Sequence, residues 1–159
     1  MAAPFRVRRL KKSDLDGIVA IENASFGRDA YDRNLFAAYF HGPRTLFLVV
    51  ERRSKVCGYA IACVGANGAE LVSIAIDRPA RRKGAASALM DSLLRRVRRR
   101  GASRISLTVK VTNRAARTFY AKYGFLRVRR MRKYYEDGAD GWRMVKRFSK
   151  PVAAGATSK

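Results

Sequence analysis

The residues best suited to chemistry form a short basic loop around one glycine. Residues 81–86 read Arg-Arg-Lys-Gly-Ala-Ala, after a run at 70–76 that predicts a strand and before spacing that predicts a helix. A loop at this position directs unpaired backbone N–H groups and the positive end of the helix dipole at one point, which favours phosphate. Gly84 and Ala86 are small where a backbone must approach a ligand closely. We therefore expect a pyrophosphate site, although a plain basic turn before a helix would look similar.

The rest of the chain predicts the elements that must position this loop. Alternating β-branched and aromatic residues predict strands at 5–10, 45–51, 55–64, 70–76, 105–111, 125–128 and 142–148. Apolar residues at helical spacing predict helices at 13–24, 35–40, 85–97 and 113–123. The chain therefore combines strands with helices, as in the α/β class.

The length of 159 residues, 48% of them hydrophobic, is enough for one domain with a hydrophobic core. We expect that domain at 1–150 and a disordered tail of small residues at 151–159. No apolar run approaches the ~20 residues that span a bilayer, and the N-terminus lacks the order of a secretory signal. We therefore expect a cytoplasmic protein with no membrane association.

The charge of the chain is strongly positive. Lysine and arginine total 35 against 12 acidic residues, which gives +23 at neutral pH. A field of this sign attracts polyanions, so nucleic acid, the ribosome or an anionic cofactor is an expected partner. The arginines at 95–100 fit two hypotheses equally well: a solvated helix end that suits the helix dipole, or a surface that docks a polyanion.

The cysteines and the histidine give weaker signals. Cys57 and Cys63 lie an even number of residues apart on one predicted strand, so we expect both on one face as buried free thiols. His41 has no second histidine or carboxylate at ligand spacing, and we expect no metal site.

A second group of motif residues follows the basic loop, at the helix after the next strand. Residues 113–125 read Asn-Arg-Ala-Ala-Arg-Thr-Phe-Tyr-Ala-Lys-Tyr-Gly-Phe. Together with the loop they resemble the acetyl-CoA loop and the Asn-x-x-Ala…Tyr…Gly-Phe helix of GNAT-type N-acetyltransferases. The similarity extends over about 5–148 and is closest to the enzymes that acetylate the N-terminal alanine of a bacterial ribosomal protein.

This resemblance implies the GNAT fold and a set of cofactor contacts. The implied sheet is mostly antiparallel, with about seven strands and about four helices, and it splays between 70–76 and 105–111 to admit the pantetheine arm of acetyl-CoA. Backbone groups of Ile74, Ala75 and Ile76 are expected to hold that arm and the acetyl carbonyl. The expected pyrophosphate and cofactor contacts are Arg81, Arg82, Lys83, Gly84, Ala85, Ala86, Ser87 and Asn113.

The same resemblance assigns the catalytic roles, with one departure. Tyr120 matches the general acid, and a phenol can supply a proton to a departing thiolate, although a core aromatic beside Phe119 is the alternative. The family's proposed base is a glutamate where this chain has Thr108, and threonine cannot accept that proton. Glu70, on the neighbouring strand, is either the base, directly or through water, or a solvated residue at a strand start.

The acceptor is expected to be an N-terminal α-amine. At pH 7 an α-amine is about one part in seven neutral and a lysine only about one in 2,500, so an α-amine needs a weaker base. The resemblance places Glu22 near the substrate ammonium and Phe26 in the opening helix, with Tyr134 and Tyr135 at the peptide entrance unless they are ordinary strand residues.

Two rival functions remain open at the level of sequence. One is the same fold acting on a small-molecule amine or a protein lysine, and the other is a non-catalytic module that binds RNA or the ribosome. The sequence leaves the oligomeric state undetermined.

Overall fold

The computed structural model describes residues 4–149, so the predicted tail at 151–159 lies outside the described residues. The strands are β1 (Arg6–Arg9), β2 (Thr45–Arg52), β3 (Lys55–Val64), β4 (Ala69–Ile76), β5 (Arg104–Lys110), β6 (Leu126–Met131) and β7 (Gly141–Arg147). The helices are α1 (Leu15–Phe26), α2 (Arg33–His41), α3 (Ala85–Arg99) and α4 (Arg114–Lys122). None of these helices has the length and apolar run that a membrane crossing requires.

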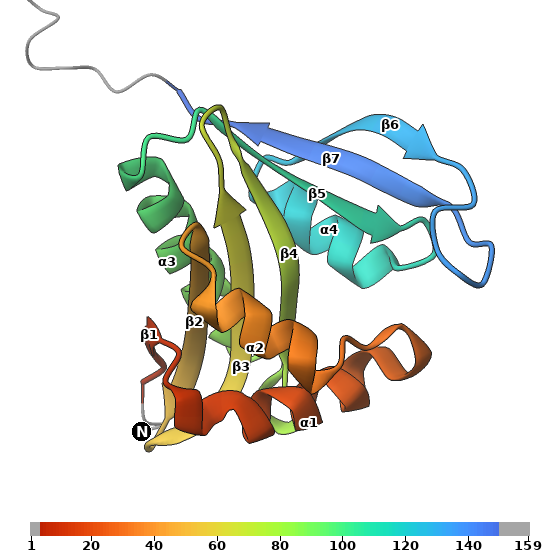
Figure 1. The fold of residues 1–159 in the computed structure, drawn as a ribbon. Helices are drawn as coiled ribbons and strands as arrows, with labels where there is room; N and C mark the ends of the chain where they lie inside the picture. Colours follow the sequence, from red (N-terminus) through yellow and green to blue (C-terminus); the bar gives the residue numbers. More distant parts are fainter. Residues whose placement is uncertain (1–3, 150–159) are drawn as a thin grey trace, which may run out of the picture.

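The seven strands form one sheet in the order β1-β2-β3-β4-β5-β7-β6 (Figure 1). All neighbours are antiparallel except β4 and β5, which are parallel. The predicted mixed, mostly antiparallel sheet with four helices is confirmed. β4 and β5 diverge along their length, so the sheet opens into two arms (Figure 1).

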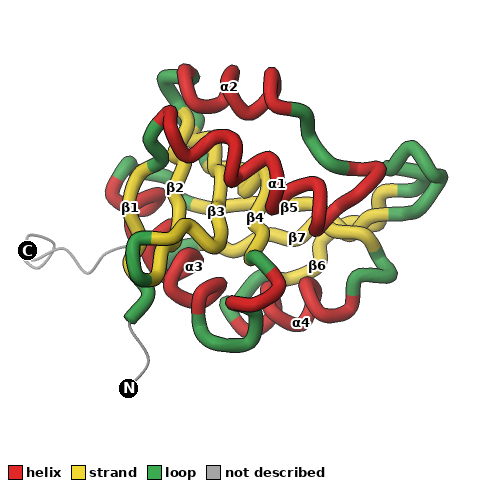
Figure 2. Tube along the Cα trace, turned by 90° about the horizontal axis from the view of Figure 1, so that it is seen from below, coloured by secondary structure: helices red, strands yellow, loops and turns green. Residues whose placement is uncertain are grey.

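Helices cover the two faces of the sheet. α1 and α2 lie on one face, and α3 and α4 on the other (Figure 2). Fully buried Ile18, Phe36 and Tyr59 belong to the core under α1 and α2, while Leu89 and Leu93 belong to the core under α3. Each helix is therefore held by the apolar stripe that its sequence predicts.

Two predicted boundaries are wrong in length. α1 continues to Phe26, because Gly27, with a positive φ of 51°, is the residue that ends it. β6 continues to Met131, three residues beyond its predicted end, because Met131 pairs with Gly141 of β7. An arginine-rich segment has little intrinsic strand preference, so tertiary pairing decided its length.

The prediction that Cys57 and Cys63 share a face is also wrong. Val50 pairs with Gly58 and Glu51 with Val56, which leaves Cys57 as the extra residue of a β-bulge. The bulge reverses the alternation, so Cys57 joins the core under α3 together with Ala62, and Cys63 faces the other way. Cys57 is a buried free thiol as predicted, whereas Cys63 is partly exposed.

Candidate active site

The site begins where β4 and β5 separate. Only two residue pairs join these strands, Ala69 with Ile105 and Glu70 with Ser106. Farther along, the β5-facing edge of β4 has no strand partner within residues 4–149, and a bulge at Val72 bends the strand there. Unpaired N–H and C=O groups of β4 are therefore available to an extended amide-containing ligand in the gap.

The basic loop lies at the end of β4 and caps α3. Arg82 and Gly84 have positive φ angles of 61° and 99°, and Gly84 is the residue before the first turn of α3. This curvature turns successive N–H groups toward one point at the positive end of a 15-residue helix. A Cβ atom added to Gly84 would meet nothing within 4 Å, so open space lies in front of the glycine.

A cavity of about 330 Å³ lies against this loop. It is lined by Ile76, Arg81, Arg82, Gly84, Ala86, Ser87, Phe119 and Lys122. Six of these residues are predicted cofactor contacts, and the structure adds Phe119 and Lys122 from α4. The arrangement brings cations, helix-terminal N–H groups and an aromatic ring to one hollow, which suits a nucleotide pyrophosphate.

Four predicted cofactor contacts lie differently from the rest. Arg81 lines the cavity, but it also donates from Nε to the Ile76 carbonyl at 2.9 Å and so fixes the loop to the end of β4. Ala85 is buried in the core under α3, and Ala75 is buried in the core under α1. Neither alanine lines a cavity, which leaves backbone groups as their means of contact, and Lys83 does not line a cavity either.

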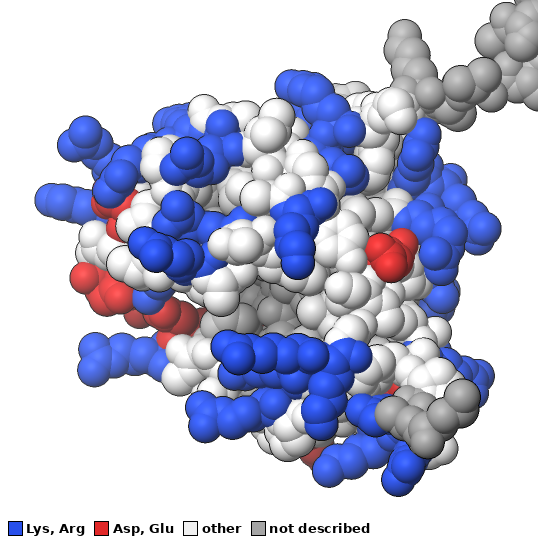
Figure 3. All heavy atoms as spheres, turned by 180° about the vertical axis from the view of Figure 1, so that it is seen from behind, with Lys and Arg blue, Asp and Glu red and all other residues white. Residues whose placement is uncertain are grey.

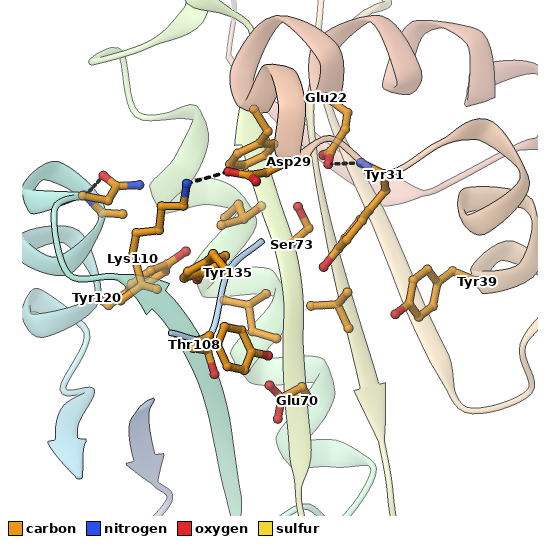
Figure 4. Close-up of a pocket in the computed structure, with 18 residues that line it drawn as sticks. Glu22, Asp29, Tyr31, Tyr39, Glu70, Ser73, Thr108, Lys110, Tyr120 and Tyr135 are labelled. Atoms are coloured by element: carbon orange, nitrogen blue, oxygen red, sulfur yellow. Dashed lines mark hydrogen bonds and ion pairs between the residues drawn. The ribbon is translucent and has the colours of Figure 1, made fainter. Parts of the chain in front are cut away.

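A larger cavity of about 390 Å³ occupies the gap itself (Figure 4). It is lined by eight of the predicted site residues: Glu22, Phe26, Glu70, Ile74, Asn113, Tyr120, Tyr134 and Tyr135. Residues that the sequence analysis missed include Asp29, Tyr31, Tyr39, Ser73 and Lys110. A signal for Lys110 was available, because it shares the strand alternation of Thr108 and so faces the same side.

Tyr120 lies on α4 at the wall of the gap (Figure 4). The residue is 9% exposed, and its ring lies 5.8 Å from the ring centroid of Phe125. Burial, followed by the nearby Tyr135, raises the pKa of the Tyr120 phenol well above its ordinary value. The hydroxyl therefore stays protonated at physiological pH and can act as a proton donor.

Asn113 is both a wall of the cavity and the cap of α4. Its side-chain oxygen accepts the Ala116 N–H at 3.1 Å, which satisfies one of the free donors at the helix start. The amide is thereby held in one orientation, and its NH₂ group is the part that can serve a ligand.

Glu70 is held by an arginine that the sequence analysis did not single out. Both Glu70 oxygens accept from Arg143, each at 2.9 Å, and Arg143 lies directly opposite Thr108 in the β5–β7 ladder. Because Thr108 is small, the guanidinium passes over it to reach Glu70. Each Glu70 oxygen keeps a further lone pair, so the carboxylate can accept an amine proton only while it is paired with a cation, which makes it a weaker base.

Glu22 is the most buried carboxylate of the site, with 1% exposure. Its oxygens accept the Tyr31 N–H at 2.9 Å and the Tyr59 hydroxyl. Burial raises the pKa of Glu22, while hydrogen bonds from Tyr31 and Ser73 oppose that rise. Glu22 thus fixes the segment after α1, and its reach toward a substrate ammonium is limited by these partners.

Aromatic rings form the walls of the larger cavity. Tyr31 and Tyr39 come from the α1–α2 side, and Tyr134 and Tyr135 come from the β6–β7 loop (Figure 4). Tyr134 and Tyr135 lie outside any strand, so ordinary strand packing does not account for them. Tyr134 is 52% exposed, as befits an entrance residue.

Comparisons with known proteins agree with this geometry. The profile of the acetyltransferase (GNAT) family matches residues 15–125. An uncharacterized N-acetyltransferase of Methanocaldococcus jannaschii is 30% identical over 150 residues, which are 94% of each protein. An N-alpha-acetyltransferase of Sulfurisphaera tokodaii is 28% identical over 154 residues, covering 89% of this chain and 92% of that protein. The ribosomal-protein-S18-alanine N-acetyltransferase of Escherichia coli superposes with a TM-score of 0.83 at 26% identity, covering 94% of this chain and 99% of that chain.

Proposed function

Because the chain belongs to the acetyltransferase (GNAT) family and is an N-acetyltransferase, we propose that it acetylates the N-terminal α-amine of a protein or peptide from acetyl-CoA. The observation that carries the proposal is a pair of cavities: one lies against the basic loop at the start of α3, and the other occupies the gap between β4 and β5, where the Tyr120 phenol is part of its wall. One cavity has the chemistry for a pyrophosphate, and the other has the walls for a peptide end. The N-alpha-acetyltransferase and the S18-alanine enzyme among the similar proteins support this choice of acceptor.

The residues present fit the donor. Arg82 and the first N–H groups of α3 would hold the pyrophosphate, with Ser87 and Lys122 beside it. The unpaired edge of β4 around Ile74 would hold the amide groups of the pantetheine arm. When bound, acetyl-CoA supplies an activated thioester carbonyl; the protein supplies position, hydrogen bonds and a proton.

Direct transfer needs no covalent enzyme intermediate. Before attack, the α-amine loses a proton to Glu70, directly or through water, or to bulk solvent. The neutral nitrogen forms the new bond to the acetyl carbon, the carbon–sulfur bond breaks, and Tyr120 gives its proton to the departing sulfur. The nitrogen then releases its extra proton to bulk solvent, and Tyr120 regains a proton from there. Burial raises the pKa of the Cys57 thiol, so this cysteine is not an activated nucleophile.

The pairing of the carboxylates in the site favours an α-amine as the acceptor. Glu70 is paired with Arg143, and Glu22 is engaged by Tyr31 and Tyr59, so no free carboxylate base lies among the residues that line the gap, Asp29 being paired with Lys110. Such a site suits an amine that is already partly neutral at pH 7. An α-amine meets that requirement about 300 times better than a lysine.

A panel of acceptors tests the proposed function. The purified protein is incubated with acetyl-CoA and peptides whose N-terminus is free or blocked, peptides with internal lysines, and small amines, and release of the CoA thiol is followed. We expect turnover with free N-termini only. Equal turnover of a blocked peptide that carries a lysine would contradict the α-amine assignment.

The basic surface supports a second proposal about where the acceptor is found. Burial lowers the pKa of Arg96, and repulsion from four nearby arginines lowers it further: Arg9, Arg95, Arg99 and Arg100. Lysine and arginine are spread over the face seen from behind, where carboxylates are few and gather mainly at one edge (Figure 3). A cluster of repelling cations is stabilised by a polyanion, so we propose that the protein works beside RNA, as on a ribosomal substrate.

Salt dependence tests this proposal. Affinity for an RNA oligonucleotide, measured by fluorescence anisotropy, is expected to fall at least about ten-fold between 50 and 200 mM salt. The triple replacement of Arg95, Arg99 and Arg100 by glutamine should remove most of that dependence, whereas the same change at Arg52, Arg53 and Lys55 should not. If the RNA affinity of the wild type did not change with salt concentration, the proposed role of this surface in RNA binding would be wrong.

A further inference from the structure

Lys110 occupies a position between two loops that wall the larger cavity. It is the last residue of β5, and it shares its face of the sheet with Thr108, while Leu107 and Val109 point into the core under α3. Its side chain therefore extends on the face where the acceptor cavity opens (Figure 4).

The Lys110 ammonium contacts one carboxylate from each loop. Nζ lies 2.7 Å from Asp29, in the short helical turn η2 (Gly27–Asp29) after α1, and 2.9 Å from Asp137, in the β6–β7 loop. It also lies 5.1 Å from the ring centroid of Tyr135. Asp29 and Asp137 are 108 positions apart in the chain, so this contact exists only in the folded protein.

Each loop is held internally by other bonds. The segment after α1 is fixed by the Tyr31 N–H to Glu22, and the β6–β7 loop by Tyr135 N–H to the Ala139 carbonyl and Ala139 N–H to Asp137. Among the hydrogen bonds and ion pairs of residues 4–149, those of Lys110 are the ones that join the two loops.

We propose that Lys110 is a positioning residue that sets the width of the acceptor entrance and thereby selects acceptors by the size of their first side chain. This rests on the proposed α-amine acetylation. Without the ammonium, Asp29 and Asp137 would be two like charges facing each other, and the loops that carry them would separate. Tyr31 and Tyr135 would move apart with their loops, and bulky first residues would then be admitted.

The test compares Lys110→Met, which keeps the length of the side chain and removes its charge, with Lys110→Arg, which keeps the charge. Lys55→Met is the matched control, because Lys55 is an exposed lysine at the remote β2–β3 turn. Hydrogen–deuterium exchange is measured on the full chain without substrates, over residues 27–32 and 134–139. Steady-state kinetics follow with peptides that begin with alanine or tryptophan.

For Lys110→Met we expect faster exchange in both loops and about a five-fold rise in KM for the alanine peptide, because the two loops lose the cation that joins them. The kcat value and the KM for acetyl-CoA should stay within about two-fold, and the preference for alanine over tryptophan should fall about five-fold. Lys110→Arg and Lys55→Met should resemble the wild type.

If exchange in both loops is unchanged in Lys110→Met, the proposed bridge is wrong. If the KM for the alanine peptide and the preference for alanine over tryptophan are unchanged, the proposed selectivity role is wrong. Because exchange is measured without substrate, its outcome is independent of the proposed function. If exchange responds but the wild type acetylates no peptide α-amine, the proposed function fails and the selectivity role fails with it, whereas the bridge between the loops stands.

Discussion

Replacing Tyr120 by phenylalanine is expected to lower kcat by about a hundred-fold or more, with little change in acetyl-CoA affinity. The substitution removes one oxygen and keeps the ring that packs against Phe119 and Phe125. The fold and the cofactor cavity should therefore persist, while the departing sulfur loses its proton donor. Kinetics, calorimetry with acetyl-CoA and the melting temperature separate these three effects.

The pH dependence gives this prediction a second, independent test. Burial raises the pKa of Tyr120, so the phenol remains protonated throughout the range from pH 6 to 10 in which its free form would begin to ionise. In the wild type, kcat/KM should rise as the acceptor α-amine loses its proton near pH 8 and should then stay level. A decline between pH 8.5 and 10 that disappears in Tyr120→Phe would contradict the raised pKa.

Glu70→Gln is the informative comparison for the role of Tyr120. If Glu70 takes the amine proton, its loss should lower kcat/KM most at low pH, where the acceptor is charged. The variant also leaves Arg143 without its carboxylate, so Arg143→Gln and the double variant should accompany it. Wild-type turnover of both Tyr120→Phe and Glu70→Gln at every pH would show that the catalytic roles are assigned wrongly.

Replacing Gly84 by alanine is expected to weaken acetyl-CoA binding at least about ten-fold. Gly84 has a φ of 99°, so any L-residue there is strained, at a cost of about 1–3 kcal/mol. The new methyl group meets no protein atom within 4 Å. It would instead point into the space where we place the pyrophosphate, and a ligand that must approach the backbone closely would be excluded.

Gly101→Ala is the matched control for this second prediction. Gly101 follows the other end of α3, has a φ of 91°, and likewise has nothing within 4 Å of an added Cβ. Both variants should lose similar stability in thermal unfolding, but only Gly84→Ala should lose cofactor affinity in calorimetry. If the two variants bound acetyl-CoA with equal affinity, the proposal that the pyrophosphate binds at this loop would be wrong.

The sequence predicted those parts of the site whose partners are close in the chain. The turn before α3 depends on a glycine at the end of a strand, and the cap of α4 joins Asn113 to Ala116, three residues away. Strand and helix periods also predicted which side chains are buried. Such features follow from local backbone sterics and from apolar patterning, both of which depend on residues that are close together in the chain.

The sequence did not predict the partner of Glu70. Arg143 is 73 residues away, and 35 lysines and arginines were available as candidates. The choice depends on the β5–β7 register, which places Arg143 opposite Thr108, and on the point at which β4 and β5 part. The bulge at Cys57 was not predicted either, because an extra residue in one strand is defined only by its pairing with the neighbouring strand.

The elements, the basic loop with its expected ligand and the tyrosine on α4 could all be predicted from the order of the residues. Which charges meet depends on the folded chain: Arg143 pairs with Glu70, and Lys110 pairs with Asp29 and Asp137. The difference is one of range. Backbone preferences and apolar periodicity act over a few residues, whereas an ion pair forms only after the burial of many apolar groups has brought distant segments to one register.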